Sequence, residues 1–523
     1  MGDEPDARGP RRPPGIDRRR LLVGFGFAAA NLGLVRALPP TPPGAAGPAR
    51  ATSPAVPRRP DPPSSPAPTD PVPDGRTFDV AIVGGRVIDP ETGLDAVANI
   101  GIDGDRIEAV TTAALTGRST IDAAGMVVTP GFIDVLSGAP TAVGGPFKVA
   151  DGVTTNLVMH GVNGIAGQSF ATWAEEGHPF HYGGAFRSPF ERARMGIDPY
   201  EPATPAQISA LAATAAAEVE AGFVGIDVEP EYTPGVDEAE IMALGEVAAA
   251  LGVPLLFHAR YSTDRPPGTN AEALAEVIRT ARRTGAAVHV EHIVSTGGTF
   301  SMVESLATLE RARGEGIAVT ACTYPYDFWA TYLGTARFDA GWQERYRIDH
   351  GDLAIAGTGE RLTPESFAHH RQRNTLAVAY AIPTEEVALA LGHPLVMVGS
   401  DAIIDPGANN HPRAAGTFAR TLGRYVRDLG VLTLTEAVAK MTIQPARLLE
   451  GRAPALRTKG RLQVGADADV CVLDPGRVAD RATVADPARA SVGIDWVLVA
   501  GEVVRAAGKS RPEVRPGRPV TYA

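Results

Sequence analysis

Cysteine is nearly absent from this chain. Of 523 residues only two are cysteines, Cys322 and Cys471. Their positions give no spacing at which two thiolates would share a metal ion. A chain with so few cysteines is not held together by disulfide bonds, even in an oxidising compartment. Both cysteines are interpreted as small buried apolar side chains.

The chain also lacks a concentrated basic region and a long apolar run. Its net charge is -11, and phosphate binding needs clustered lysine and arginine, so nucleic acid is excluded as a partner. The uncharged run at residues 21–35 is shorter than the roughly 20 apolar residues that span a bilayer. It follows Arg18, Arg19 and Arg20, which is typical of a twin-arginine-type signal peptide.

We therefore expect residues 1–38 to be read by the twin-arginine export machinery and then removed. The mature protein would be periplasmic or extracellular, with no permanent membrane anchor. An N-terminal anchor or a chance basic tail is the alternative. Residues 39–76 are rich in Pro, Ala, Ser and Asp and poor in large apolar side chains, which predicts a disordered linker.

Short strands with alternating apolar residues are predicted at both ends of the remaining chain. They lie within residues 77–128 and again within 446–523, with Gly or Asp at the turns. We expect the two ends to pair into one small β-sandwich domain followed by a tail. Two separate caps are the alternative.

Residues 129–445 contain eight short apolar runs, several of them separated by segments with helical periodicity. The runs are VTPGFIDVL, TTNLVMH, FHYGGAF, FVGIDVE, PLLFHAR, AAVHVEH, AVTACTYP and LVMVGSD. Eight parallel strands alternating with helices predict an α/β fold, a (β/α)8 barrel of the TIM type. A doubly wound open sheet is the competing architecture, but no glycine-rich phosphate-binding fingerprint follows the first strand. The segment after TYPYDFWATYL is interpreted as a long loop and a candidate lid.

Histidines end three of the eight runs: His160, His258 and His292. A lone strand-end histidine is more often a structural hydrogen-bonding group than a ligand. Two on successive strands favour a metal site, because neighbouring strand ends of a barrel bring imidazoles into one coordination sphere. His289 lies three residues before His292, so we expect it on the opposite side in a structural role.

Carboxylates end two further runs. Glu229 closes the fourth run and is a candidate metal ligand, although Asp227 shares its face and one of the two could serve only as a hydrogen-bonded neighbour. Asp401 ends the eighth run. It could cap a turn, but we favour a carboxylate that takes a proton from water and hands it to a leaving nitrogen.

Several longer motifs carry a family resemblance from about Phe78 to near the C-terminus. They are TPGFID, EAGFVGID followed by EYTPG, TYPYD, GSDAIID, HPRAAGTFAR and KGRLQVGADADV. Together with the His258 and His292 strands, they resemble the amidohydrolase superfamily and, within it, the N-acyl-D-amino-acid deacylases.

The resemblance implies roles for individual residues. It makes His258 and His292 zinc ligands and Asp401 the general base, and it places His160 near a position where the branch uses a cysteine ligand. The HPR string and the TYPYD motif imply a substrate-binding group made of Tyr324, Arg413 and His411.

The sequence departs from the family pattern at four positions. Leu136 and Gly138 stand where two histidines are expected, which leaves one zinc ion in place of two. Val294 stands where the branch has a carboxylate-binding lysine, and Ala330 where it has a serine. Arg413 could still hold a substrate carboxylate through two hydrogen bonds.

These observations predict an exported, zinc-dependent hydrolase of a carbon–nitrogen amide bond in a small molecule such as an N-acyl amino acid. Two alternatives stay open: a cyclic amide or imide hydrolase that uses the same metal, and a metal-free pseudoenzyme that binds a small ligand. The sequence does not define the oligomeric state.

Overall fold

The computed structural model describes residues 75–404, 406–407 and 409–523. All of them belong to one compact unit. The predicted signal peptide, 1–38, and the linker up to residue 74 lie outside the described residues.

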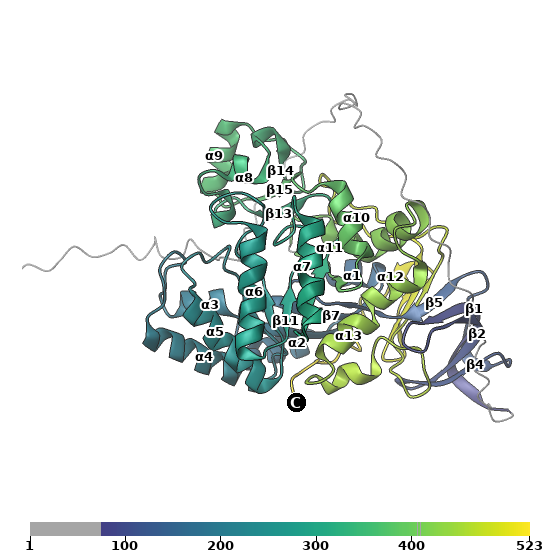
Figure 1. Cartoon of the computed structure of the whole chain (residues 1–523). Coiled ribbons are helices and arrows are strands. Elements are labelled where there is room, and N and C mark those ends of the chain that lie inside the picture. Colours follow the sequence, from purple (N-terminus) through teal and green to yellow (C-terminus); the bar gives the residue numbers. More distant parts are fainter. Residues whose placement is uncertain (1–74, 405, 408) are drawn as a thin grey trace, which may run out of the picture. The chain divides into compact units, whose positions relative to one another are not determined.

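Eight parallel strands form the central sheet, and each coincides with one of the eight predicted runs. Two of these strands, β7 and β11, are labelled in Figure 1. They are β6 (Phe132–Asp134), β7 (Val153–Val162), β8 (His181–Arg187), β9 (Ile226–Val228), β10 (Leu255–Phe257), β11 (Val288–Val290), β12 (Val319–Thr323) and β16 (Val396–Val398). Beyond the two edge strands, a parallel bridge joins Ser137 to Ala402, and the Asp401 N–H donates to the Leu136 carbonyl at 2.6 Å. The predicted (β/α)8 barrel is confirmed.

Helices follow the strands and carry the apolar periodicity read from the sequence. Around the first six strands they are α1 (Gly145–Ala150), α2 (Ala166–Glu176), α3 (Ser188–Arg194), α4 (Pro205–Glu220), α5 (Glu238–Leu251), α6 (Asn270–Thr284) and α7 (Met302–Gly314). Thr204 and Thr269 each make a capping box that starts α4 and α6, and Gly285 ends α6 in the left-handed region, where glycine has no Cβ to strain.

The last part of the barrel is also helical. It contains α10 (Thr384–Gly392), α11 (Arg413–Arg420), a π-helical turn η3 (Thr421–Asp428), α12 (Leu434–Met441), α13 (Ile443–Leu449) and a short 3-10 turn η4 (Pro454–Thr458). α11 runs directly into the π-helical turn. Arg413, at the start of α11, donates to the Asp401 carbonyl and so lies close to the end of β16.

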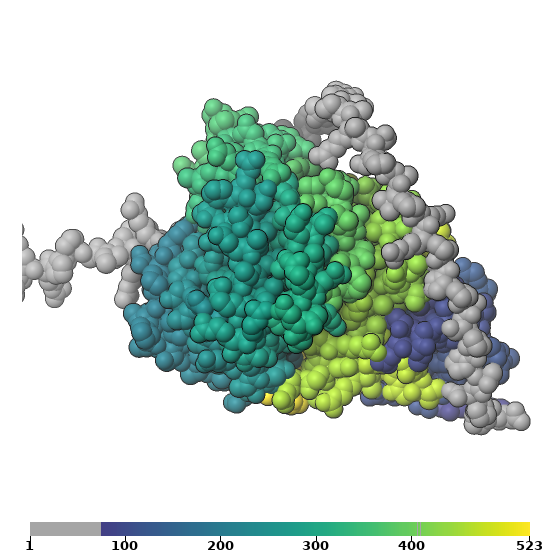
Figure 2. All heavy atoms as spheres, in the orientation of Figure 1, coloured from purple at the N-terminus to yellow at the C-terminus, as the bar shows by residue number. Residues whose placement is uncertain are grey.

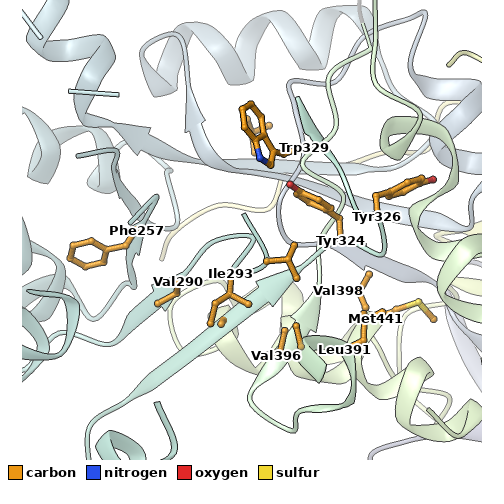
Figure 3. Packing of buried hydrophobic residues seen from close by; sticks show 14 of the residues in the cluster. Phe257, Val290, Ile293, Tyr324, Tyr326, Trp329, Leu391, Val396, Val398 and Met441 are labelled. Atoms are coloured by element: carbon orange, nitrogen blue, oxygen red, sulfur yellow. The ribbon is translucent and has the colours of Figure 1, made fainter. Parts of the chain in front are cut away.

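Two apolar cores lie on opposite faces of the barrel strands. Phe257, Val290, Val396 and Val398 belong to the larger core, between the strands and the surrounding helices, part of which is drawn in Figure 3. Alternate strand residues point the other way, and a separate buried cluster that includes Leu256 fills the barrel interior. Inward-facing residues at the strand ends therefore meet at the rim of the barrel.

Strands from both ends of the described chain form one nine-stranded sheet, with the order β20-β19-β18-β17-β5-β1-β2-β3 and β4 beside β1. They are β1 (Thr77–Asp89), β2 (Leu94–Asp103), β3 (Arg106–Thr111), β4 (Thr116–Asp122), β5 (Val127–Pro130), β17 (Val470–Leu473), β18 (Ile494–Val499), β19 (Glu502–Ala506) and β20 (Lys509–Ser510). The two ends join where β5 and β17 pair antiparallel. Figure 2 shows the N-terminal and C-terminal segments against each other on one face. The small β domain built from both ends is confirmed, and it encloses its own core.

A folded module stands where the sequence suggested a long loop after the seventh strand. It contains β13 (Trp329–Tyr332), β14 (Leu353–Ile355) and β15 (Leu376–Ala379), paired antiparallel, with α8 (Trp342–Tyr346), α9 (Pro364–Gln372) and the 3-10 turns η1 (Ala336–Phe338) and η2 (His350–Asp352). We call residues 329–379 the inserted module. Buried aromatic side chains such as Trp329 and Phe338 join its core to that of the barrel, which accounts for its ordered structure.

The C-terminal tail returns to the barrel. The Tyr182 N–H donates to the Arg518 carbonyl and the Val520 N–H to the Tyr182 carbonyl, so the tail lies beside the start of β8. Val520 is fully buried with residues of the barrel interior. Among the described residues, no helix combines the length and apolar character needed to cross a membrane.

Candidate metal centre

Three imidazoles meet at the rim of the barrel. His160 lies near the end of β7, His258 follows β10 and His292 follows β11. Their ring centroids are 5.4 Å apart for His160 and His258, 5.5 Å for His160 and His292, and 4.8 Å for His258 and His292. His258 and His292 are almost fully buried. The structure thus brings together the three histidines that the sequence singled out.

A local change in backbone direction brings Glu291 and His292 to the same site. His289 faces inward, hydrogen-bonded to Thr320 of the neighbouring strand, and Glu291 follows it in the two-residue alternation. In a regular strand His292 would face the side opposite to Glu291. Its backbone has φ 24°, outside the extended region, so the chain turns at this residue. Both side chains therefore face the same space, and His289 has the structural role that we expected.

Glu291 is a fourth member of the cluster. One of its oxygens contacts Nδ1 of His160, and the other has no hydrogen-bond partner although the side chain is fully buried. Glu291 was not among the residues predicted from the sequence. The strand pattern did indicate it, because Glu291 lies two residues after His289 and therefore faces the same side of the strand.

His258 is held by Glu231 in the loop after β9. Its Nε2 lies 2.7 Å from Glu231 Oε2, and a carboxylate partner places the ring proton on Nε2. Its Nδ1 is buried and has no hydrogen-bond partner, which leaves a lone pair directed into the cluster. A carboxylate behind a ligating histidine fixes the ring's orientation and tautomer.

The donor set fits a transition metal ion. One ligand atom from each of His160, His258, Glu291 and His292 lies within 4.8 Å of the other three. Three imidazole nitrogens and one carboxylate oxygen suit zinc and similar divalent ions. The unpartnered Nδ1 of His258 and the free oxygen of Glu291 are the atoms that such an ion would satisfy.

Charges around the cluster act differently on its histidines. Burial lowers the pKa of His258 in spite of Glu231, and burial together with the neighbouring His258 takes the pKa of His292 well below its usual value. Both are therefore neutral, the form that binds metal. Burial opposes protonation of His160 as well, but Glu291 and Glu229 raise its pKa well above the usual value. A cation bound beside these carboxylates would replace that proton.

Glu229 lies at the edge of the cluster. Its Oε2 is 4.0 Å from His160 Nε2, yet its two oxygens are held by Nε and Nη2 of Arg187 at 2.5 and 2.9 Å. Asp227 is buried beside it and lies near enough to His160 and Glu229 to form a second group of ligand atoms. Arg187 already balances the charge of Glu229, so the structure favours the other four residues as the primary site.

Asp401 faces the cluster from the end of β16. Its Oδ2 lies 4.0 Å from His292 Nε2 and 2.8 Å from Arg413 Nη2, and Arg413 Nε also donates to its carbonyl at 2.6 Å. Asp401 has φ 51°, in the left-handed region that Asp tolerates better than most residues. Its carboxylate is thereby turned toward the metal ligands.

The residues expected to bind substrate lie beside Asp401. The Tyr324 ring is 5.0 Å from the Arg413 guanidinium carbon, and its hydroxyl and Nη1 of Arg413 are buried without hydrogen-bond partners among the described residues. Burial raises the pKa of Tyr324 to about 12, so this hydroxyl keeps its proton. His411 accepts a hydrogen bond from the Arg413 backbone N–H at 2.8 Å and packs against Phe328.

The first strand offers no metal ligand at the two positions where histidines are missing. Leu136 is fully buried in the barrel interior, and a Cβ on Gly138 would lie 2.3 Å from the Ala402 carbonyl oxygen. On the same side Asp134 is already paired with the buried Lys148, which also donates to Ser400. These groups fill the barrel seam, by which we mean the place where the first strand, β6, meets the eighth, β16.

Comparison with known proteins identifies the family of the chain. Residues 189–505 match the Amidohydrolase family. The chain is 33% identical over 483 residues to an N-acyl-D-glutamate deacylase of Alcaligenes xylosoxydans xylosoxydans, covering 84% of this chain and 96% of that protein. It is 29% identical over 481 residues to a D-aminoacylase of the same organism, covering 82% and 95%. A dihydroorotase of Geobacter metallireducens is 23% identical over 442 residues, covering 76% of this chain and 90% of that protein.

Solved structures give the same result. An N-acyl-D-glutamate deacylase of Bordetella bronchiseptica, complexed with zinc and a phosphonate that mimics the tetrahedral intermediate, aligns with a TM-score of 0.74 at 31% identity, covering 85% of this chain and 100% of that one. A D-aminoacylase studied for its binuclear metal centre, with one-metal activation and second-metal attenuation, aligns with a TM-score of 0.74 at 25% identity and the same coverage.

The fold and the rim residues define a barrel hydrolase of carbon–nitrogen bonds other than peptide bonds. The chain belongs to the amidohydrolase family and to its N-acyl-D-amino-acid deacylase-like branch.

Proposed function

We propose that this protein is a zinc-dependent deacylase that cleaves the amide bond of a small anionic N-acyl amino acid, with the D-configuration as the first candidate. The observation that carries the proposal is the convergence of His160, His258, His292 and Glu291 opposite Asp401. The relatives that act on N-acyl-D-amino acids support the substrate class.

One ion is proposed, held by the three histidines and Glu291. When bound, it would polarise the amide carbonyl and make water acidic enough to attack at neutral pH. A second ion at the first strand is not expected, because Leu136 offers no ligand and Gly138 has no space for one.

The protein's own groups would move the proton and hold the substrate. Asp401 accepts a proton from the attacking water and delivers it to the leaving nitrogen. Arg413 fixes Asp401 through Nη2 and Nε, and its Nη1, together with the Tyr324 hydroxyl, is free to hold a substrate carboxylate. Holding the anionic end places the amide bond between Asp401 and the metal ligands.

Export is part of the proposal. The arginine triplet at residues 18–20 and the short uncharged run after it support a periplasmic or extracellular enzyme. Fractionation of cells expressing the full chain, with and without Arg18→Lys and Arg19→Lys, tests it. Equal amounts outside the cytoplasm for both versions would contradict it.

The activity is tested by screening purified protein, with its metal content measured, against N-acetyl-D-amino acids, their L-forms, and small lactams and imides. Release of a free amino acid from the linear D-substrates is expected. Asp401→Asn should abolish turnover while its metal content stays unchanged. Turnover only of cyclic amides would replace the proposal by the cyclic amide alternative, and protein without bound metal would favour a pseudoenzyme.

A further inference from the structure

Arg337 of the inserted module is buried at the rim of the barrel. It is 2% exposed, and its guanidinium carbon lies 4.2 Å from the centre of the Trp329 ring. Its Nη2 donates to the Ser295 carbonyl at 2.8 Å and to the Ser262 hydroxyl at 3.2 Å. One side chain of the module therefore binds the loops that follow both β10 and β11, and these loops carry two of the proposed metal ligands.

Arg337 also reaches the carboxylate that orients His258. Its Nε lies 3.5 Å from Glu231 Oε2, and the same Nε donates to the Tyr346 hydroxyl at 3.2 Å. Tyr346, on α8 of the module, donates in turn to Glu231 Oε1 at 3.0 Å, and Ser262 donates to the same oxygen at 2.5 Å. Two of the groups that hold Glu231 thus come from the inserted module.

The charge of Arg337 lies beside the carboxylate of Glu231. Nε of Arg337 is 3.5 Å from Glu231 Oε2, and the two side chains are only 3% and 7% exposed. An ionised carboxylate accepts from the His258 ring N–H and leaves the other nitrogen for a ligand. Without the guanidinium, a buried charge at Glu231 would lack its main partner.

We propose that Arg337 and Tyr346 are positioning residues of the metal centre, which act through Glu231 to hold His258 with Nδ1 toward the ion. The inserted module is then part of the support of the site. This inference rests on the proposed metal-dependent function. Coupling is reciprocal, so docking of the module tightens ion binding and a bound ion stabilises the docked module.

The test measures zinc affinity by competition with a chelator, and the visible spectrum of the cobalt-substituted protein, for the full chain and three variants. Tyr346→Phe removes one hydroxyl. Arg337→Lys keeps the positive charge but loses the planar guanidinium with its several N–H donors, and Arg337→Met loses both the charge and these donors. We expect zinc dissociation constants that are about 10- to 100-fold higher for Arg337→Met, with smaller increases for the other two, and an altered cobalt spectrum.

Matched controls come from Arg361 in the same module and from Tyr380, which directly follows it. Arg361 stacks on Tyr380 and donates to the Gly351 carbonyl. The hydrogen bonds and ion pairs of Glu231 within the described part of the chain go to His258, Ser262, Tyr346 and Arg337. Arg361→Met and Tyr380→Phe should therefore leave zinc affinity and the cobalt spectrum unchanged. In a Glu231→Gln background, Tyr346→Phe should change zinc affinity little further, because Tyr346 acts on His258 only through the Glu231 carboxylate, which is already gone.

Hydrogen exchange supplies an independent readout. Backbone amides of residues 329–379 should exchange more slowly with zinc bound than in the metal-free wild type, and this difference should shrink in Tyr346→Phe. If the wild type binds zinc and both Tyr346→Phe and Arg337→Lys bind it equally well with the same cobalt spectrum, the inference is wrong while the proposed function stands. A wild-type protein that binds no ion overturns both.

Discussion

Arg413 and Asp401 form a largely buried ion pair in which one guanidinium holds both the carboxylate and the backbone carbonyl of the same residue. Nη2 lies 2.8 Å from Oδ2, and Nε lies 2.6 Å from the carbonyl oxygen. The left-handed backbone of Asp401 makes this double contact possible. The direction of the proposed base therefore depends on Arg413.

Replacing Arg413 should reduce both activity and stability. Arg413→Met leaves a largely buried Asp401 without its partner, which should cost about 3 kcal/mol of unfolding free energy and lower kcat/KM by about 10²-fold or more. Arg413→Lys keeps a charge but cannot contact both groups, so stability should recover more than activity does. Denaturant unfolding and steady-state kinetics on the same preparations measure the two effects. If Arg413→Lys recovers stability and activity to the same extent, the two-pronged contact of the guanidinium is not needed.

Glu291 should contribute to ion affinity. Glu291→Gln keeps the size of the side chain but removes the negative charge beside His160, so zinc binding should weaken by about 10- to 100-fold, a range typical for groups that hold or orient metal ligands. Isothermal titration of the metal-free protein measures this. Glu240→Gln, on α5 and paired with Arg192, is the control for loss of a buried carboxylate elsewhere. An unchanged zinc affinity in Glu291→Gln would remove this residue from the ligand set.

The first-strand seam should reject any side chain at position 138. Gly138→Ala brings a Cβ to 2.3 Å from a backbone oxygen, and overpacking of this kind costs about 1–3 kcal/mol. Gly167, within α2, has no atom within 4 Å of a Cβ, so Gly167→Ala should be neutral or stabilising by up to about 1 kcal/mol. Thermal unfolding of the two variants compares them. If Gly138→Ala is as stable as wild type, the barrel seam can open and a second ion site is sterically possible.

Asp469 should make the fold sensitive to acid. It is buried directly before β17 in the small β domain. Lys459, His181 and the Ala500 N–H contact its carboxylate at 2.8, 3.1 and 2.8 Å. Burial alone would raise its pKa, but Lys459 and His181 hold the pKa below the ordinary value of 3.8. The stability that this carboxylate contributes is therefore fully present above pH about 4 and is lost as the pH falls through the lower folded-state pKa.

Asp469→Asn should thus be less stable than wild type by about 3–5 kcal/mol at pH 7, with the difference constant down to pH about 4 and smaller below it. Urea unfolding at pH 7, 5, 4 and 3 measures the difference. Asp428→Asn, an exposed residue paired with Arg427, should change stability little at any of these pH values. If the stability difference between wild type and Asp469→Asn grows below pH 4, the prediction is wrong, because the folded-state pKa of Asp469 would then lie above its unfolded value.

The barrel was predictable because its strands are buried on both faces. A run such as PLLFHAR is apolar until the strand ends, and the polar residue that follows must lie at the rim. The same logic identified His258, His292 and Asp401. The inserted module was not predictable as a fold, since its strands are short and its aromatic residues, such as Trp329, are buried only through contacts with distant segments.

Parts of the site were missed for local reasons. Strict alternation placed Glu291 and His292 on opposite sides, and only the backbone turn at His292 brings both to one site. Glu231 and Arg337 lie 106 positions apart in the sequence (337 − 231) and meet through packing of the module, which no local pattern records. That the two ends form one β domain was expected from their similar strand patterns, but the particular pairing of β5 with β17 and the return of the tail to β8 had no sequence signal.

The most direct test of the whole account is the metal content of the purified protein, measured by elemental analysis after growth with supplied zinc. We expect one ion per chain in the wild type, one in Asp401→Asn, and less than one tenth of that in a His258→Ala, His292→Ala double variant that remains folded. A wild-type protein with no stoichiometric ion, or a double variant that keeps its full complement, would contradict the central claim that these imidazoles hold a catalytic metal.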